Sequence, residues 1–140
     1  MSTRKKRRAA VIAAVILLLA LLLGGDTWTR LYVRLNARKL ESFAAAALEG
    51  EEVSRYGIWD VSRYPEAGMV EFLTGGYGLA PSTVYKGFYY SASDEHIPFQ
   101  AVEQPMEESG DTARWQEPAG DNWGTSRRIV PRWFWYEAHF

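Results

Sequence analysis

The N-terminal quarter of the chain has the sharpest division between polar and apolar positions. Five consecutive basic residues, 4–8, lead into residues 9–25, which contain no charged or polar side chain. As a helix this segment rises about 1.5 Å per residue and reaches roughly 26 Å, close to the apolar thickness of a bilayer. We predict a transmembrane helix. A cleaved signal peptide has the same pattern, although Leu22 and Leu23 suit its cleavage site poorly.

Basic residues on the two sides of this segment predict its orientation. Five precede it, and four follow closely, at Arg30, Arg34, Arg38 and Lys39. The excess places the N-terminus in the cytoplasm and the rest of the chain outside it. The predicted organisation is a basic cytoplasmic tail (1–8), a transmembrane helix (9–25), a juxtamembrane helix (26–50) and an antiparallel β domain (51–140).

A second helix is expected from about Thr27 to Glu49. Asp26 is a suitable N-cap and Gly50 a natural stop. An imperfect apolar stripe supports the helix, formed by Leu31, Leu35, Leu40, Phe43 and Ala47. On the same helix Arg30, Arg34 and Arg38 recur every four residues and share one face. This face is either simply solvated or contacts anionic lipid or a wall polymer.

Beyond residue 53 the pattern changes to short apolar stretches between turns. We predict strands at 58–64, 69–74, 84–91 and 97–102 and a final strand at 125–140, with Gly75–Gly78 breaking the second. Residues 103–122 are expected to form an acidic loop that Trp115 anchors to the rest of the domain. The fold class is therefore α+β, with one long helix packed on a small antiparallel sheet.

The final predicted strand is too apolar to lie at an edge, so we place it in the middle of the sheet. Tyr85 and Tyr89 share one face of their strand, and Trp133 and Trp135 share one face of theirs. If these strands pair, the four rings could form an exposed platform that binds a sugar or a protein. The alternative is that the preceding helix covers them as core.

Charge and composition exclude several classes of function. Residues 26–140 keep eleven of the sixteen basic side chains and all seventeen acidic ones, a formal net charge of −6. Nucleic acid is therefore not an expected partner, because phosphate binding needs clustered cations. The chain has no cysteine, so thiol catalysis and thiolate metal sites are excluded.

The sequence offers little for catalysis or cofactors. His96 and His139 are the only histidines, and Gly75–Gly78 lacks the context of a nucleotide-binding loop. No catalytic, cofactor or metal residue is assigned. A hydrolase with paired carboxylates could be assembled from Asp94, Glu95 or Glu137. A hydrolase would also require a cleft in which a carboxylate and a histidine converge.

Segments of the C-terminal half resemble a known family. Residues 75–82 (GGYGLAPS), 85–91 (YKGFYYS) and 133–140 (WFWYEAHF) are similar to stretches in a family of short single-pass membrane proteins of Gram-positive, clostridia-type bacteria. The resemblance implies a cell type and a membrane topology, but no activity and no site residues.

These observations predict a membrane-anchored extracytoplasmic domain that binds an envelope protein or a cell-wall glycan without catalysis. Two alternatives stay open. The first is an accessory subunit of a membrane complex, for which the small residues of the apolar segment would form a helix-packing surface. The second is a cell-wall-modifying hydrolase.

Overall fold

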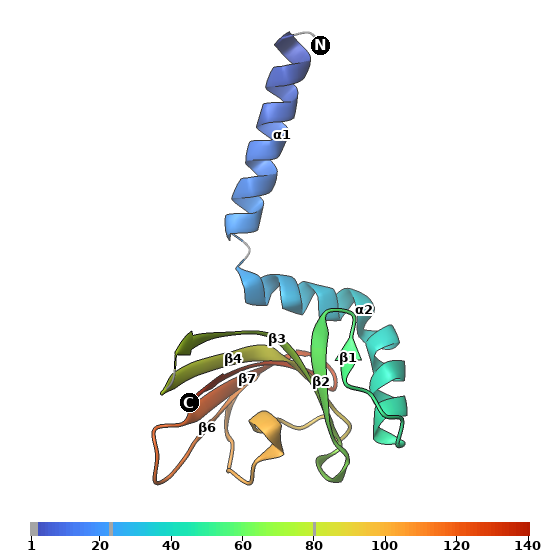
Figure 1. Ribbon diagram of the computed structural model, residues 1–140, viewed down its shortest axis with the longest axis vertical. Coiled ribbons are helices and arrows are strands. Elements are labelled where there is room, and N and C mark those ends of the chain that lie inside the picture. The colour runs from blue at the N-terminus through green and yellow to red at the C-terminus, as the bar shows by residue number, and fades with distance from the viewer. Residues whose placement is uncertain (1–2, 23, 80) are drawn as a thin grey trace.

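A computed structural model describes residues 3–22, 24–79 and 81–140 (Figure 1). Residues 1, 2, 23 and 80 lie outside the described residues, so parts of the predicted tail, the predicted span and the GGYGLAPS segment are not placed. Two helices precede an eight-stranded antiparallel sheet, and the second helix packs on the sheet. The predicted α+β class is confirmed.

Helix α1, Thr3–Leu22, extends away from the rest of the protein (Figure 1). None of its residues is buried, and its apolar side chains from Val11 to Leu22 are exposed. Among the described residues no single helix is both long and apolar enough to cross a membrane. Helices α1 and α2 together meet that requirement, although they are bent by 94°, and a signal sequence would meet it too.

Helix α2, Gly25–Leu48, confirms the predicted second helix. Gly24 occupies the N-cap position, so Asp26 lies in the first turn rather than capping it. In the first turn the Asp26 carboxylate still interacts favourably with the positive end of the helix dipole. The buried positions Val33, Leu40, Ala44 and Ala47 follow a helical period and face the sheet. The helix crosses strands from β2 to β7.

The sheet has the strand order β1-β2-β3-β4-β8-β7-β6-β5. The strands span Arg55–Tyr56 (β1), Trp59–Tyr64 (β2), Met69–Leu79 (β3), Ser82–Ser91 (β4), Glu107–Ser109 (β5), Thr112–Gln116 (β6), Trp123–Val130 (β7) and Trp133–His139 (β8). Short 3-10 turns lie at Pro65–Ala67 (η1) and Phe99–Ala101 (η2). Strand β8 lies in the middle of the sheet, as predicted.

The two faces of the sheet carry separate apolar clusters. Phe72, Phe88 and Trp133 pack beneath α2 on one face. Tyr89 and Phe134 stack on the other face, with ring centroids 5.1 Å apart. Residues 95–102, called the strap below, cover part of this second face through Ile97 and Phe99. Side chains of one strand therefore alternate between two different cores.

Several predicted strand boundaries are wrong. Gly75–Gly78 does not break its strand: β3 continues through it to Leu79, with a register shift between Leu73 and Gly75. Residues 97–102 form η2 and extended chain rather than a return strand. The expected loop at 103–122 contains the β5–β6 hairpin. The expected final strand is two strands that turn at Pro131–Arg132, with Arg132 at φ +67°.

Candidate functional site

The structure does not assemble the predicted four-ring platform. Strands β4 and β8 do pair, but Tyr85 faces Ala138 and Tyr89 faces Phe134 across the ladder. Directly opposed residues share a face, so the tyrosines lie on the strap side and Trp133 and Trp135 lie on the helix side. Tyr89 is 0% and Trp133 1% exposed. The four rings therefore do not form one exposed platform, and for Tyr89 and Trp133 the alternative holds, because both rings belong to the cores.

The three arginines predicted to share a face of the juxtamembrane helix have different surroundings. Arg30 is half-buried and donates to the carbonyl of Asp26 at 3.4 Å and to Thr27 Oγ1 at 3.4 Å. It therefore stabilises the first turn of α2. Arg34 and Arg38 are exposed, so they are accessible to an external anion.

A line of polar and aromatic side chains crosses the helix-side face of the sheet beyond the area that α2 covers. We call it the cross-strand row; it consists of Tyr77 (β3), Lys86 (β4), Glu137 and His139 (β8), Trp123 (β7) and Arg114 (β6). The sequence pattern did not reveal it, because its members come from five strands and the β4–β8 pairing joins two segments that are far apart along the chain.

The first half of the cross-strand row centres on one carboxylate. Lys86 Nζ lies 3.2 Å from Glu137 Oε2 and 5.7 Å from the ring centroid of Tyr77. His139 Nε2 lies 2.6 Å from the other oxygen, Glu137 Oε1. Both carboxylate oxygens are thus occupied by cationic or imidazole nitrogens. The Lys86, Glu137 and His139 side chains are 20–35% exposed, so a ligand can still reach them.

The second half of the cross-strand row is a stack. The His139 ring lies parallel to Trp123, with centroids 3.9 Å apart and planes 7° from parallel. The Arg114 guanidinium carbon lies 4.6 Å from the centroid of the Trp123 ring. Arg114 in turn pairs in register with Glu107 of β5. Cation–π and stacking contacts hold these side chains in one arrangement.

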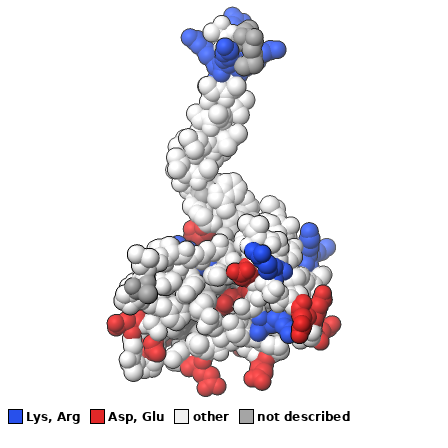
Figure 2. Space-filling model, viewed as in Figure 1, with Lys and Arg blue, Asp and Glu red and all other residues white. Residues whose placement is uncertain are grey.

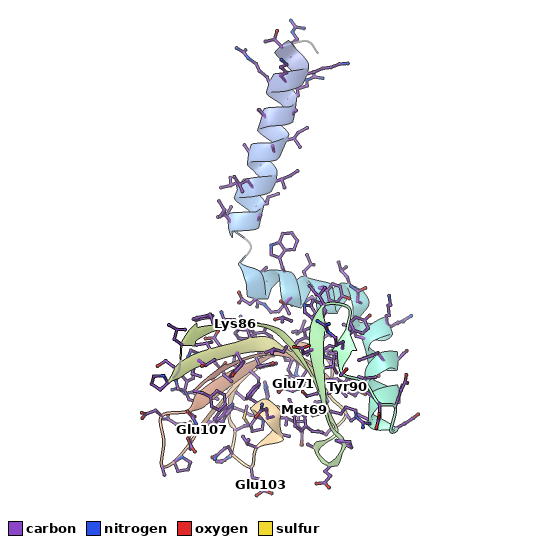
Figure 3. The ribbon with its side chains drawn as sticks, in the orientation of Figure 1. Met69, Glu71, Lys86, Tyr90, Glu103 and Glu107 are labelled. Atoms are coloured by element: carbon purple, nitrogen blue, oxygen red, sulfur yellow. The ribbon has the colours of Figure 1, made fainter. Side chains whose placement is uncertain are left out.

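Two surface hollows adjoin the ends of the cross-strand row. A hollow of about 300 Å³ lies between the start of α2, at Gly25 and Asp26, and Lys86 with Trp135 on the sheet. The second, of about 490 Å³, is lined by Arg114, Trp123 and residues of the β5–β6 hairpin. Figure 3 shows Lys86 beneath the start of α2, and Glu107, which pairs with Arg114, lower in the domain and farther from α2. The row therefore runs away from α1.

The strap side holds a histidine–serine contact that is less accessible. His96 Nδ1 and Ser126 Oγ are 2.5 Å apart, but Ser126 is only 2% exposed. Burial lowers the pKa of His96, although nearby carboxylates oppose this effect. A substrate cannot reach the Ser126 hydroxyl in this arrangement, so the contact serves packing rather than nucleophilic chemistry.

Beside it, Asp94 fixes the turn between β7 and β8. Its carboxylate pairs with Arg128 and accepts the backbone N–H of Arg132 at 2.6 Å. Slight burial opposes ionisation, but the Arg132 N–H and the Arg128 guanidinium outweigh it and hold the pKa of Asp94 below its usual value. Asp94, which we considered as a hydrolase carboxylate, is thus a structural anchor of this turn.

Glu71 is a buried carboxylate on the strap side. Its Oε2 accepts the backbone N–H of Gln100 at 3.0 Å, and Gln100 has a left-handed φ of +56°. Burial raises the pKa of Glu71 from 4.5 to about 7, although the Gln100 N–H partly offsets the effect. The nearby Tyr136 hydroxyl is buried and has no hydrogen-bond partner among the residues that the structure describes, and burial together with Glu71 raises the pKa of Tyr136. Glu71 therefore couples the strap to the sheet.

Comparisons with protein-family models, with curated proteins and with solved structures gave no match. The resemblance to the clostridia-type membrane proteins stays a prediction. Among residues 3–22, 24–79 and 81–140, no group of three metal-ligating side chains converges. The cross-strand row is the accessible polar constellation that we take forward as the candidate site.

Proposed function

We propose that the protein is a single-pass membrane protein with a cytoplasmic N-terminus and a non-catalytic binding domain outside the membrane. Helix α1 supports the anchor, because its apolar side chains are exposed and none packs on the sheet. Helix α2 buries one face against the sheet and is therefore unavailable to cross a bilayer. The five basic residues at 4–8 support the orientation.

The distribution of charged side chains in Figure 2 supports the same arrangement. Basic side chains gather at the free end of α1, the rest of this helix is uncharged, and acidic side chains on this face lie mostly on the part of the domain remote from α1. A negatively charged bilayer surface repels acidic groups and attracts basic ones. This distribution suits a domain whose acidic side faces away from the membrane.

The cross-strand row is the observation that supports binding of a polar polymer. Lys86, Glu137, His139 and Arg114 provide alternating cationic, anionic and imidazole groups along one line. Adjacent strands are about 4.8 Å apart, so the four strands from β4 to β6 provide a line of roughly 14 Å. A glycan presents hydroxyl and amide groups at intervals along its length, so we favour a cell-wall glycan as the ligand over an envelope protein.

We expect Glu137→Gln to weaken binding to the wall. The substitution keeps the shape of the side chain but removes the charge that orders Lys86 and His139. The full-length protein in detergent micelles would be incubated with insoluble cell-wall material, and the bound fraction measured after sedimentation. We expect roughly a tenfold loss of affinity, as is typical when one member of a partly buried charge pair is removed.

The control is Asp60→Asn, which alters another cross-strand ion pair with the same change in charge. Arg55 and Asp60 lie 3.6 Å apart at the β1–β2 hairpin and are largely exposed. Binding by this variant should equal that of the wild type. Equal binding by Glu137→Gln would exclude the cross-strand row as the site, and failure of the wild type to sediment with wall material would redirect the search to a protein partner, including a membrane complex.

One observation favours a hydrolase as the second candidate function. Glu137 and His139 are a carboxylate and a histidine in contact, and Lys86 connects them to the 300 Å³ hollow. In the same incubation a hydrolase would release soluble fragments from the wall. We expect no release. Time-dependent release that is abolished by His139→Gln would establish catalysis and overturn the binding-only proposal.

A further inference from the structure

The outer face of α2 is an exposed surface that combines apolar and basic side chains. Trp28, Leu31 and Leu35 are 47%, 41% and 76% exposed. The exposed Arg38 and Lys39 continue the same face at helical spacing, opposite the buried positions. Three large apolar side chains along one solvent-facing stripe are unusual for a helix whose other face already packs on a sheet.

A second element contributes to the same side of the domain. The turn between β1 and β2 lies beside α2, on the side of the domain from which α1 extends (Figure 1). Ile58 in this turn is 84% exposed. Its neighbour Trp59 contacts Tyr32 of α2, with ring centroids 4.9 Å apart. Two separate segments thus present apolar side chains toward the side of the domain from which α1 extends.

The angle between α1 and α2 indicates that a bilayer could cover the exposed outer face of α2. Helices α1 and α2 are bent by 94°. If α1 lies along the bilayer normal, α2 begins parallel to the bilayer plane, within one turn of the end of the apolar segment. Tryptophan and long aliphatic side chains then lie at the depth of the headgroups, and flanking basic side chains meet anionic phosphates.

We propose that the outer face of α2, together with Ile58, docks on the surface of the anionic bilayer in which α1 is anchored. This inference rests on the membrane anchor of the proposed function. The surface, called the docking face below, consists of Trp28, Leu31, Leu35, Arg38, Lys39 and Ile58. The N-terminal part of α2, which runs perpendicular to α1 (Figure 1), is then a layer between the lipid headgroups and the sheet rather than a flexible stalk.

Docking would also fix the distance of the candidate site from the membrane surface. The hollow between the start of α2 and Lys86 includes Gly25 and Asp26. It therefore lies next to the headgroups, and the cross-strand row leads from there away from the membrane (Figure 3). The domain would engage a polymer that reaches the membrane surface rather than one at the end of a long tether.

The absence of cysteine allows a direct test. The full-length chain with Leu35→Cys would carry a nitroxide spin label in nanodiscs that contain anionic phospholipid. Accessibility to oxygen, which partitions into lipid, is compared with accessibility to a water-soluble nickel chelate. The control is Val102→Cys, which is 41% exposed and lies in the strap, on the other face of the sheet.

We expect the label at position 35 to be roughly fivefold less accessible to the nickel chelate than the label at 102, with higher accessibility to oxygen. Replacing both Arg38 and Lys39 by Gln should reduce this difference. Equal chelate accessibility at 35 and 102 would overturn the proposal. Protection at 35 from both reagents would also overturn it, because a protein surface rather than lipid would then cover the helix.

A third label separates failure of docking from failure of the anchor. Leu18→Cys places a label in α1, where the side chain is 55% exposed. If the label at position 18 lies in lipid and the label at position 35 lies in water, the anchor is retained and the docking face is rejected. If both are in water, the membrane anchor itself is rejected.

Discussion

Gly87→Ala is expected to destabilise the protein by about 3 kcal/mol or more, because the middle of the sheet has no room for a methyl group. Gly87 lies on β4 opposite Leu73 of β3. A Cβ at this position would lie 1.9 Å from the carbonyl oxygen of Phe72 and 2.8 Å from the Tyr136 ring. Because the Phe72 carbonyl oxygen belongs to the backbone of β3, β3 and β4 would have to separate to make room for the methyl group.

The measurement is denaturant unfolding of the full-length protein in micelles, followed by tryptophan fluorescence. Gly75→Ala is the matched control, since it lies in the same hairpin and its added Cβ would meet nothing within 4 Å. We expect that variant to remain within about 0.5 kcal/mol of the wild type. If Gly87→Ala were as stable as Gly75→Ala, the β3–β4 packing described above would be incorrect.

The second prediction with a large effect concerns the pH dependence of the free energy of unfolding, to which Glu71 contributes. Its pKa is about 7 in the folded protein and 4.5 as the ordinary value. Between these values the native state retains a proton that the unfolded chain has released. The free energy of unfolding therefore falls as the pH rises through this window and stays low above it. The expected loss is about 3 kcal/mol between pH 4.5 and pH 8.

Glu71→Gln should abolish this part of the pH dependence, because an amide does not titrate but can still accept the Gln100 N–H. The measurement is the difference in unfolding free energy between wild type and variant at pH 5 and at pH 8, so that contributions from other groups cancel. Glu66→Gln, at an exposed position in η1, controls for the change in net charge. Parallel pH profiles of wild type and Glu71→Gln would show that this carboxylate is not protonated in the native state.

Elements with a strong local pattern could be predicted from the sequence. The helix around residues 27–49 and the central position of β8 could be predicted from their apolar residues. The predicted apolar stripe of the helix is only partly correct, because Leu40 and Ala47 are buried against the sheet whereas Leu31 and Leu35 are exposed on the opposite face. The final strand was predicted as one element because its turn contains Arg132 in a left-handed conformation, which favours glycine. The β5–β6 hairpin was missed because its strands are short and polar, although Gly110 marked its turn.

The candidate site could not be predicted because it depends on the register of several strand pairs, including the pairing of β4 with the distant β8. Alternation along a strand separates its two faces, but it does not say which face of β4 adjoins which face of β8. Tyr85 pairs with Ala138 rather than with a tryptophan, and this single fact removes the expected platform. The β4–β8 register also brings Lys86 opposite Glu137, and the β7–β8 register brings Trp123 opposite His139; together the two registers create the cross-strand row.

The most direct test of the central claim is the protease accessibility of an epitope tag at the C-terminus in intact cells. We predict that the tagged protein has full-length mass and is digested by protease added outside, since α1 anchors a domain that lies beyond the membrane. Protection of the full-length protein would contradict the orientation. A tagged band about 2–3 kDa shorter would contradict the anchor, because the N-terminal segment would then be a cleaved signal.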